Sequence, residues 1–493
     1  MKKYKIFDSL FTASLLFLSA VLPTNIGVSA KADTINKEIN FEKADVNKDG
    51  LISVGDLSLG YSEKLLTLDN AKAISKNMGF YPYKRTLIIG IDGTGNAFYP
   101  NAPYYGNSTI DTVRSTPFIN SLFEKGAVTH NSMVDMPSNS APGWIAALHG
   151  YSFYEADSKY QIINETAESK PYPSDSPYPS IFKIAKQEQP NRRAASFSNW
   201  SGINTGIIEN NIGAEFFSGK DDEVTSQLID YIKSGKAKES SMLYVHLNDV
   251  DYAGHTAGWF GDEFYKALTA KDKNVKDIVN AMEEANLLED SLIILTTDHG
   301  GRDMGHGNEH PETMTTFISF YGPTIPSNKL LDGGKQKDIP TIISKAMGYK
   351  PADTWTGTLW DKSLFLDQRE LLNKSDAIPS LRLLQSSFNN KISLVLDNLK
   401  NEFSALDVTL SYDPSKIKIT NFNISSDIKI INNSQAPGTL RIILLGSELQ
   451  KDIPLLNIQY NYLGLRSFAA NSIKIEKVMA ADKNGNETLL SIK

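Results

Sequence analysis

Residues 87–95 read Leu-Ile-Ile-Gly-Ile-Asp-Gly-Thr-Gly, an apolar run that ends in an aspartate. Further apolar runs and helical patterns alternate after it: Glu223–Ile232, Met242–Leu247, Ala270–Ala285, Leu292–Thr296 and Thr316–Tyr321. Short apolar strands that alternate with helices predict an α/β fold, with a parallel-rich sheet flanked by helices. In such sheets ligands bind at the carboxyl ends of the strands, so we look for chemistry there.

The composition is that of a globular protein of two or three domains. The chain has 493 residues, of which 41% are hydrophobic and 22% charged, and its formal net charge is −7. This small charge gives no reason to expect nucleic acid or an anionic membrane as a partner. The chain has no cysteine, which excludes disulfides, a thiol nucleophile and a cysteine-based zinc site. Any catalytic metal must be held by His, Asp and Glu.

The N-terminus has the pattern of a signal peptide. Lys2, Lys3 and Lys5 precede an apolar stretch that runs to about Leu22, and small residues suited to cleavage follow up to Ala32. We therefore predict that residues 1–32 are a signal peptide and that the protein is secreted, to the extracellular space or the cell surface. No later stretch is long and apolar enough to span a bilayer.

The remaining chain divides into four parts by composition. Residues 33–80 form a short polar segment with one distinctive loop, and residues 81–368 form the α/β region. A polar stretch at 369–390 is expected to be a linker. From residue 391 to 493 the pattern becomes one of short strands separated by turn signals, at Ile392–Leu396, Ala405–Tyr412, Ile417–Thr420, Leu440–Leu445 and Leu455–Tyr460. Strands at this spacing predict a β-sandwich.

Five of the seven histidines fall between residues 246 and 310: His246, His255, His299, His306 and His310. Three groups of ligand-type residues stand out in the α/β region. They are Asp92 after the first strand, Asp251-Tyr-Ala-Gly-His255, and Asp298-His299 with His306 seven residues on. Zinc binds imidazole and carboxylate, and two nearby metals can hold both oxygens of an in-line displacement. Each group alone is equally typical of a turn or a cap, but six such residues at strand ends favour a two-metal site.

The order of these motifs resembles the alkaline phosphatase superfamily, and most closely its type I phosphodiesterase/nucleotide pyrophosphatase branch. The resemblance covers about residues 84–323. It implies two zinc ions, with manganese or magnesium as alternatives. It also implies that one metal is held by Asp92, Ser140, Asp298 and His299, and the other by Asp251, His255 and His306. His306-Gly307 fits the family pattern better than His310, which is the second choice for that ligand.

The nucleophile implied by the resemblance is Ser140, in the segment Ser140-Ala-Pro142. Pro142 suits the first turn of a helix, and a helix N-terminus binds anions through its free N–H groups. From the local sequence alone Ser140 would be read as a helix cap, and Ser138 is the reserve candidate. The family also suggests that Asn164 hydrogen-bonds a phosphoryl oxygen, although Asn164-Glu-Thr equally fits a glycosylation site.

Together these features predict a secreted two-metal hydrolase that cleaves phosphate mono- or diesters through a phosphoserine intermediate. One alternative is a binding or scaffold protein with an inactive hydrolase domain. Another is a phosphotransferase, phosphonate hydrolase or sulfatase on the same site. Sulfatase chemistry is disfavoured because Trp144 stands where sulfatases have an arginine, and because no cysteine exists.

Residues 45–56 fit a calcium loop, with ligands at Asp45, Asn47, Asp49, Leu51 (through its carbonyl) and Asp56. This loop resembles one repeat of a type I dockerin, although dockerins have two. The C-terminal part resembles a cohesin, at Ala405–Pro414 and Gly438–Leu445. The resemblance implies a dockerin or cohesin module as a partner, within an extracellular assembly. The alternative is that the cohesin-like domain simply packs on the enzyme.

Overall fold

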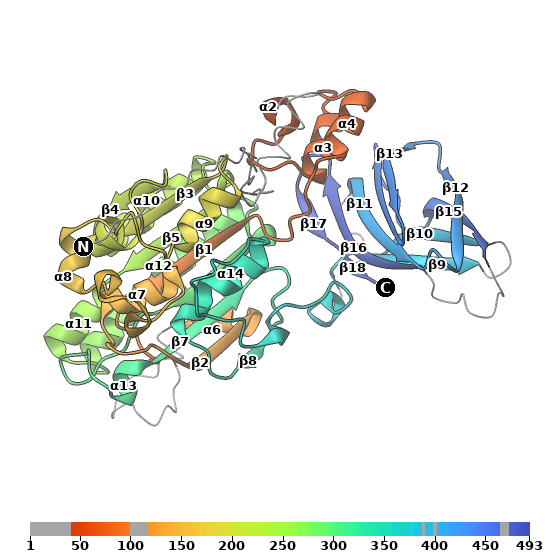
Figure 1. The fold of residues 1–493 in the computed structure, drawn as a ribbon. Coiled ribbons are helices and arrows are strands. Elements are labelled where there is room, and N and C mark those ends of the chain that lie inside the picture. The colour runs from red at the N-terminus through yellow and green to blue at the C-terminus, as the bar shows by residue number, and fades with distance from the viewer. Residues whose placement is uncertain (1–40, 99–115, 376, 387–389, 398–401, 464–472) are drawn as a thin grey trace, which may run out of the picture.

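A computed structural model of the chain describes residues 41–98, 116–375, 377–386, 390–397, 402–463 and 473–493. The α/β region lies at the left of Figure 1, the C-terminal sandwich at the right, and the N-terminal helices above the junction between them. The predicted signal peptide, residues 1–32, falls outside the described residues. In the described part, no helix has the length and apolar character needed to cross a membrane.

An eight-stranded sheet forms the middle of the α/β region, in the order β4-β3-β5-β1-β6-β7-β2-β8. Strands β1, β3, β4, β5 and β6 run parallel, β7 is antiparallel to β6 and β2, and β2 is parallel to β8. The strands are β1 Arg85–Ile91, β2 Ala127–Met133, β3 Arg193–Ser198, β4 Glu215–Ser218, β5 Ser240–Leu247, β6 Ser291–Thr296, β7 Thr315–Tyr321 and β8 Lys329–Leu331.

Helices cover both faces of this sheet, because its central strands are apolar on both sides. In β1, Ile88 packs into the core beneath α7, α9 and α14, whereas Leu87 and Ile89 pack into the core beneath α6, α10 and α12. The helices are α6 Pro117–Lys125, α7 Ser140–His149, α8 Asn164–Ser169, α9 Ile181–Glu188, α10 Asp221–Lys233, α11 Asp249–Ala257, α12 Asp262–Glu284, α13 Pro311–Met314 and α14 Ile339–Met347. The α/β fold predicted from the sequence is confirmed.

The C-terminal part consists of two five-stranded sheets, β12-β15-β10-β9-β18 and β13-β14-β11-β16-β17, that are almost wholly antiparallel and share one apolar core. The strands are β9 Ser380–Ser386, β10 Lys391–Asp397, β11 Phe403–Tyr412, β12 Ile417–Ile424, β13 Ile428–Ala436, β14 Thr439–Gly446, β15 Pro454–Tyr462, β16 Ile473–Asp482, β17 Glu487–Leu489 and β18 Ser491–Ile492. Strand β9 lies inside the range 369–390 that the sequence predicts as a linker. Leu381 is buried in the core there, so the sandwich begins earlier than its polar composition indicates.

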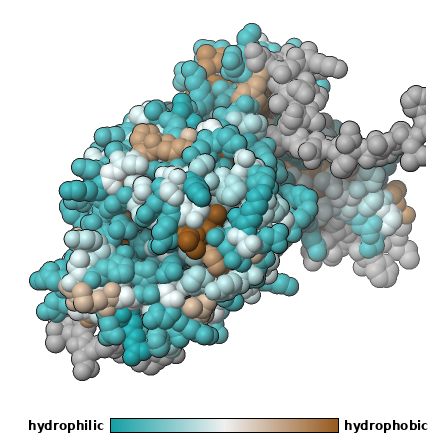
Figure 2. Space-filling view, turned by 60° about the vertical axis from the view of Figure 1, so that its left-hand side comes forward, coloured by the Kyte–Doolittle hydropathy of each residue, from teal (hydrophilic) through white to brown (hydrophobic). Residues whose placement is uncertain are grey.

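Three short helices, α2 Phe41–Ala44, α3 Val54–Ser62 and α4 Leu68–Ser75, precede β1. They pack on the sheet β13-β14-β11-β16-β17 of the sandwich. Figure 2 shows the face of the α/β region that lies at the left of Figure 1; this face is mostly hydrophilic, with hydrophobic side chains in small separate groups.

Candidate metal centre

The sheet topology brings the predicted ligands together at one edge. Asp92 follows β1, Asp298 and His299 follow β6, and α11, which begins two residues after β5, carries Asp251 and His255. Because β5 and β6 are the two neighbours of β1 and run parallel to it, their carboxyl ends meet. Among the described residues, the two groups of Asp and His side chains whose ligand atoms lie within 4.8 Å of one another are both found here.

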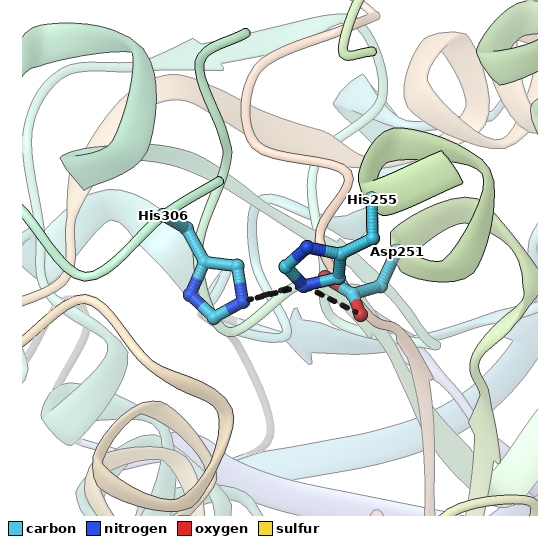
Figure 3. A group of neighbouring side chains, drawn as sticks. All are labelled: Asp251, His255 and His306. Atoms are coloured by element: carbon cyan, nitrogen blue, oxygen red, sulfur yellow. Dashed lines mark hydrogen bonds and ion pairs between the residues drawn. The ribbon is translucent and has the colours of Figure 1, made fainter. Parts of the chain in front are cut away.

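The first group consists of Asp251, His255 and His306. Asp251 and His255 lie one turn apart on α11, and His306 reaches them from the loop after β6 (Figure 3). The Nε2 atoms of His255 and His306 are 3.0 Å apart. The carboxylate of Asp251 lies 3.6 Å from His255 Nε2 and 3.8 Å from His306 Nε2. His255 is partly exposed, so this side of the centre is open to solvent.

The second group consists of Asp92, Asp251 and His299. His299 Nε2 lies 3.6 Å from Asp92 Oδ1, 3.4 Å from Asp298 Oδ2 and 3.3 Å from Ser140 Oγ. Asp92, Asp298 and His299 are fully buried. Asp251 belongs to both groups and therefore lies between two adjacent positions for a cation.

The three histidines of these groups share one tautomer, which we assign from their hydrogen bonds. His255 Nδ1 lies 3.1 Å from the carbonyl of Met304, and His299 Nδ1 lies 2.8 Å from the carbonyl of Gly300. His306 Nδ1 lies 3.1 Å from the carbonyl of Ser138 and 3.0 Å from Asn139 Oδ1. Each Nδ1–H therefore donates to an oxygen, and each Nε2 keeps its lone pair. This is the arrangement of histidines that bind metals.

The carboxylates also lack the partners that buried charges need. Asp92 Oδ1, Asp251 Oδ1 and Asp298 Oδ2 are buried and accept no hydrogen bond within the described residues. Burial and the charge of Asp92 raise the pKa of Asp251 to about 8 and that of Asp298 well above its usual range. Burial lowers the pKa of His306 to about 3 and keeps its imidazole neutral. These unpartnered carboxylate oxygens lie beside the Nε2 lone pairs of His255 and His306, which face each other. Such electron-rich atoms repel one another unless cations lie between them, so these residues fit bound metal.

Ser140 is the first residue of α7, and its side chain faces this cluster. The amide of Asn164 lies beside it, since Asn164 Oδ1 accepts the N–H of Ala141 at 2.9 Å. The hydroxyl of Ser138 instead donates to the carbonyl of Asn308 at 3.0 Å. The structure thus brings Ser140 and Asn164 together with the ligands, and occupies Ser138 elsewhere.

Three contacts around the ligands were not predicted. His246 Nε2 donates to Asp92 Oδ2 at 2.9 Å, and Trp144 Nε1 donates to the same oxygen at 3.1 Å. These two bonds leave Oδ1 of Asp92 to face the cluster. The third contact is the one between Asn139 Oδ1 and His306 Nδ1. One signal was available in the sequence, since His246 is an imidazole near the end of a buried strand whose neighbouring residues, Val245 and Leu247, are apolar.

His310, the second choice for the ligand at His306, lies outside the cluster of metal-binding candidates. His310 precedes α13, and its Nδ1 lies 3.4 Å from Nη1 of Arg302, an exposed residue. His310 belongs to neither group of clustered ligands, whereas His306 does. The geometry therefore favours His306 between the two alternatives that the sequence left open.

The predicted calcium loop is folded around its own carboxylates. Asp45 accepts the N–H groups of Asp49 and Gly50, and Asp56 accepts those of Asn47 and Ser53. Asp49 accepts the N–H of Leu51 and, through its other oxygen, the ammonium of Lys84 at 2.7 Å. Calcium binding by this loop stays a prediction.

Comparison with known proteins identifies the family of the α/β region. The sequence model of the family "Type I phosphodiesterase / nucleotide pyrophosphatase" matches residues 86–347, more than half of the chain. GPI ethanolamine phosphate transferase 1 of Yarrowia lipolytica is 25% identical over 259 residues, which are 48% of this chain and 26% of the relative. A 2,3-bisphosphoglycerate-independent phosphoglycerate mutase of Hydrogenovibrio crunogenus is 29% identical over 146 residues, 29% of this chain and 26% of the relative.

The match thus spans about a quarter of the length of these curated relatives. Among solved structures, murine ectonucleotide pyrophosphatase / phosphodiesterase 5 aligns with a TM-score of 0.45 and 12% identity, covering 57% of this chain and 100% of that one.

Proposed function

Because the chain belongs to the type I phosphodiesterase / nucleotide pyrophosphatase family, we propose that it is a two-metal phosphoric ester hydrolase that uses Ser140 as its nucleophile. The proposed substrates are phosphate mono- or diesters. The observation that carries this proposal is the position of Ser140. Its hydroxyl lies at the start of a helix and 3.3 Å from His299. The buried neighbours Asp92 and Asp298 each present one oxygen that accepts no hydrogen bond from the residues that the structure describes.

Two zinc ions suit the mixed set of imidazole and carboxylate donors, and manganese or magnesium are the alternatives. Asp92, Asp298, His299 and Ser140 would hold one ion, and Asp251, His255 and His306 the other. Bound there, the ions would supply Lewis-acid stabilisation of the phosphoryl oxygens and of the serine alkoxide. The His255 side of the centre opens to solvent, which is where a substrate can enter.

The chain's own residues set the rest of the chemistry. The hydroxyl of Ser140 loses its proton and attacks phosphorus, so that a Ser140 Oγ–P bond forms and the bond to the leaving oxygen breaks. The leaving oxygen departs as an alkoxide and takes up a proton to become the alcohol, which balances the proton that Ser140 lost. The oxygen of Asn164 holds the first turn of α7 through Ala141, which leaves its NH₂ group as the donor for a phosphoryl oxygen. Water then cleaves the Oγ–P bond and restores the serine.

Initial rates on an aryl phosphate, an aryl phosphodiester and an aryl sulfate test the proposal, with zinc supplied. We expect wild type to hydrolyse one of the phosphate esters and Ser140→Ala to lose this activity, because the attacking oxygen is removed. Ser138→Ala is the comparison, and loss in that variant instead would reassign the nucleophile. A folded, metal-loaded protein inactive on every ester would favour the binding or scaffold alternative.

A phosphotransferase is the second candidate, and the names of the curated relatives favour it: one is an ethanolamine phosphate transferase and the other a phosphoglycerate mutase. In this case an alcohol takes the place of water and receives the phosphoryl group from Ser140. Phosphorus NMR of the products, with and without ethanolamine or glycerol, separates the two candidates. A transferase gives new phosphorus signals from the phosphoester of the acceptor, while the rate at which the substrate disappears stays the same.

We also propose secretion and calcium binding, on the sequence patterns described above. N-terminal sequencing of protein recovered from the culture medium tests cleavage near Ala32. Titration calorimetry with calcium, for wild type and Asp45→Ala, tests the loop. An uncleaved N-terminus, or equal heats for the two proteins, would refute the respective proposal.

A further inference from the structure

One sheet of the C-terminal sandwich is apolar on both faces. In β11, Leu406 and Val408 point into the core of the sandwich, whereas Ala405 packs on the outer side. In β14, Leu444 points into the core of the sandwich, and Ile443 packs on the outer side. An outer face with this composition would be an exposed apolar patch, and soluble proteins cover such patches. The residues that cover it come from the other end of the chain.

Residues 41–80 form this cover, which we call the N-terminal segment. Leu57 of α3 and Ala71 and Ile74 of α4 are fully buried in one core with Ala405, Ile443 and Ala481 of the sandwich. Helix α3 lies across β11 and β16, and α4 lies against β13. These partners are more than 300 residues apart in the sequence.

Polar contacts fix the register of this packing. The N–H of Gly55 donates to Glu487 Oε1 at 2.8 Å, and the hydroxyl of Ser58 donates to the carbonyl of Asp482 at 2.6 Å. Arg441 donates to the carbonyl of Met78 at 3.2 Å. The approach at Gly55 is so close that a Cβ there would lie 2.5 Å from the carbonyl oxygen of Gly485. The surfaces are therefore complementary at atomic detail.

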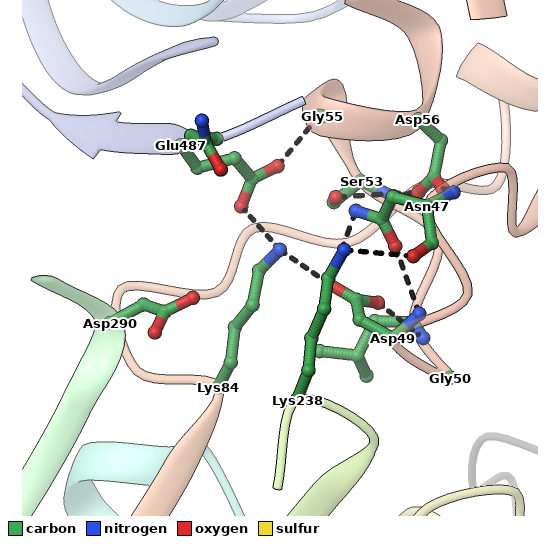
Figure 4. A network of polar contacts seen from close by, with 12 residues as sticks. Asn47, Asp49, Gly50, Ser53, Gly55, Asp56, Lys84, Lys238, Asp290 and Glu487 are labelled. Atoms are coloured by element: carbon green, nitrogen blue, oxygen red, sulfur yellow. Dashed lines mark hydrogen bonds and ion pairs between the residues drawn. The ribbon is translucent and has the colours of Figure 1, made fainter. Parts of the chain in front are cut away.

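The α/β region joins both parts through the buried ammonium of Lys84 (Figure 4), and Arg192 and Lys238 add contacts to the N-terminal segment. Lys84, the residue before β1, lies with its ammonium 2.7 Å from Asp49 of the N-terminal segment and 3.1 Å from Glu487 of the sandwich. All three side chains are almost wholly buried. Lys238 donates to the carbonyl of Asn47 at 3.0 Å, and Arg192 donates to that of Asp49.

We propose that the N-terminal segment is an intramolecular ligand of the C-terminal sandwich. Their contact holds together, without a covalent bond, the parts of the chain that precede and follow the α/β region. The resemblance to a cohesin implied a partner for the sandwich; on this view the outer face of one of its sheets is already filled by the same chain. The proposal does not depend on the proposed function. It also gives a chain without cysteine a means of closing a loop of about 300 residues in the folded state, where the contacts must offset the entropic cost of loop closure.

The test is a nick in the full-length protein. A recognition sequence for a site-specific protease is inserted after Lys76, which is exposed, and the folded protein is cleaved and passed over a size-exclusion column at 1 μM or below. We expect the N-terminal fragment to stay with the rest of the chain. Release of the fragment from the nicked wild type would overturn the proposal.

Gly55→Leu is the variant that addresses the interface alone. The backbone at Gly55 is helical, so leucine favours α3 itself, but its side chain meets Gly485. We expect nicked Gly55→Leu to release at least ten times as much of the N-terminal fragment as nicked wild type releases. Glu63→Leu, at the exposed C-terminal end of α3, is the control and should retain it. Equal retention by Gly55→Leu and wild type would contradict the proposal.

Two further measurements keep the test decisive. Ser58→Leu removes the bond to Asp482 and is the second variant, in case Gly55→Leu fails to fold by circular dichroism. The mass of the uncut protein by light scattering should be that of one chain, whereas a dimer whose segments exchange would overturn the cis arrangement. Binding of the uncut wild type to immobilised dockerin or cohesin modules at micromolar concentration through this face, abolished by Ala481→Glu, would also overturn it.

Discussion

At His306 the proton on Nδ1 decides what the residue can do. Asn139 and the carbonyl of Ser138 accept that proton, so Nε2 faces Asp251 and His255 as a lone pair. We expect His306→Ala to lose one bound metal and to lower kcat/KM by more than about 100-fold, the upper range for loss of residues that merely support a ligand. Metal analysis and initial rates check this.

His310→Ala is the matched control for that variant, since His310 lies four residues on and contacts Arg302 instead. It should keep both metals and most of the activity. The reverse outcome would show that the ligand assignment between the two histidines is mistaken.

His246 contacts the candidate metal centre through Asp92. Its Nδ1 lies 3.4 Å from the N–H of Trp200, which places the ring proton on Nε2, toward Asp92. We expect His246→Phe to weaken metal affinity by about 10- to 100-fold, because Asp92 loses a bond that orients it. His246→Gln can restore an N–H donor and should recover part of the affinity. Competition with a chelator measures both; equal affinities for the two variants would leave only a packing role for His246.

Among the elements, α7 is held unusually close to the end of β6. A Cβ on Gly143 would lie 2.7 Å from the carbonyl oxygen of Asp298 and 2.8 Å from its Cβ. Gly143→Ala must therefore push Ser140 and Asp298 apart, and we expect kcat to fall by about 100-fold, as a 1 Å misplacement can cause. Circular dichroism should show the helix intact, since alanine favours it.

Gly305→Ala is the control for this change. Gly305 lies one residue before His306, and a Cβ there meets nothing within 4 Å. Its activity should stay close to that of wild type. Similar losses in both variants would mean that added side-chain bulk near the centre, rather than the spacing of α7 from Asp298, lowers the rate.

The strands that the sequence predicted are those that carry their own apolar signal. Strands β1, β5 and β6 are buried on both faces and read as continuous apolar runs. Strand β3, Arg193-Ala-Ala-Ser-Phe-Ser198, was missed because its small and polar residues interrupt any apolar run, and its burial comes from neighbouring elements. The ligands after β1 and β6 were predictable for the same reason, whereas the bonds of Trp144 and His246 to Asp92 join three elements and leave no local pattern.

Across the whole molecule, the candidate metal centre and the accessory parts lie at opposite ends of β1. Lys84 precedes the strand and Asp92 follows it, and its seven residues span about 23 Å at the usual rise. Arg85 pairs with Asp290 at the same end as Lys84. The sequence indicated the loop at 45–56 and the sandwich separately. It could not indicate that they meet, because the contacts of Lys84 depend on three parts of the chain coming together.

The buried ammonium of Lys84 yields the last prediction. Burial alone would favour the neutral amine, but Asp49 and Glu487 raise the pKa of Lys84 above its usual value and keep it charged. Lys84→Met leaves both carboxylates buried without their cation, and we expect a loss of about 3–5 kcal/mol in unfolding free energy. Because the change lies at the far end of β1, KM of the folded protein should stay the same.

Lys72→Met, which removes an exposed pair with Asp69, is the control and should cost less than about 1 kcal/mol. Denaturant unfolding of the three proteins, followed by activity at low denaturant, checks both. A change in KM without a change in stability would mean that the accessory parts act on the metal centre and not on the fold.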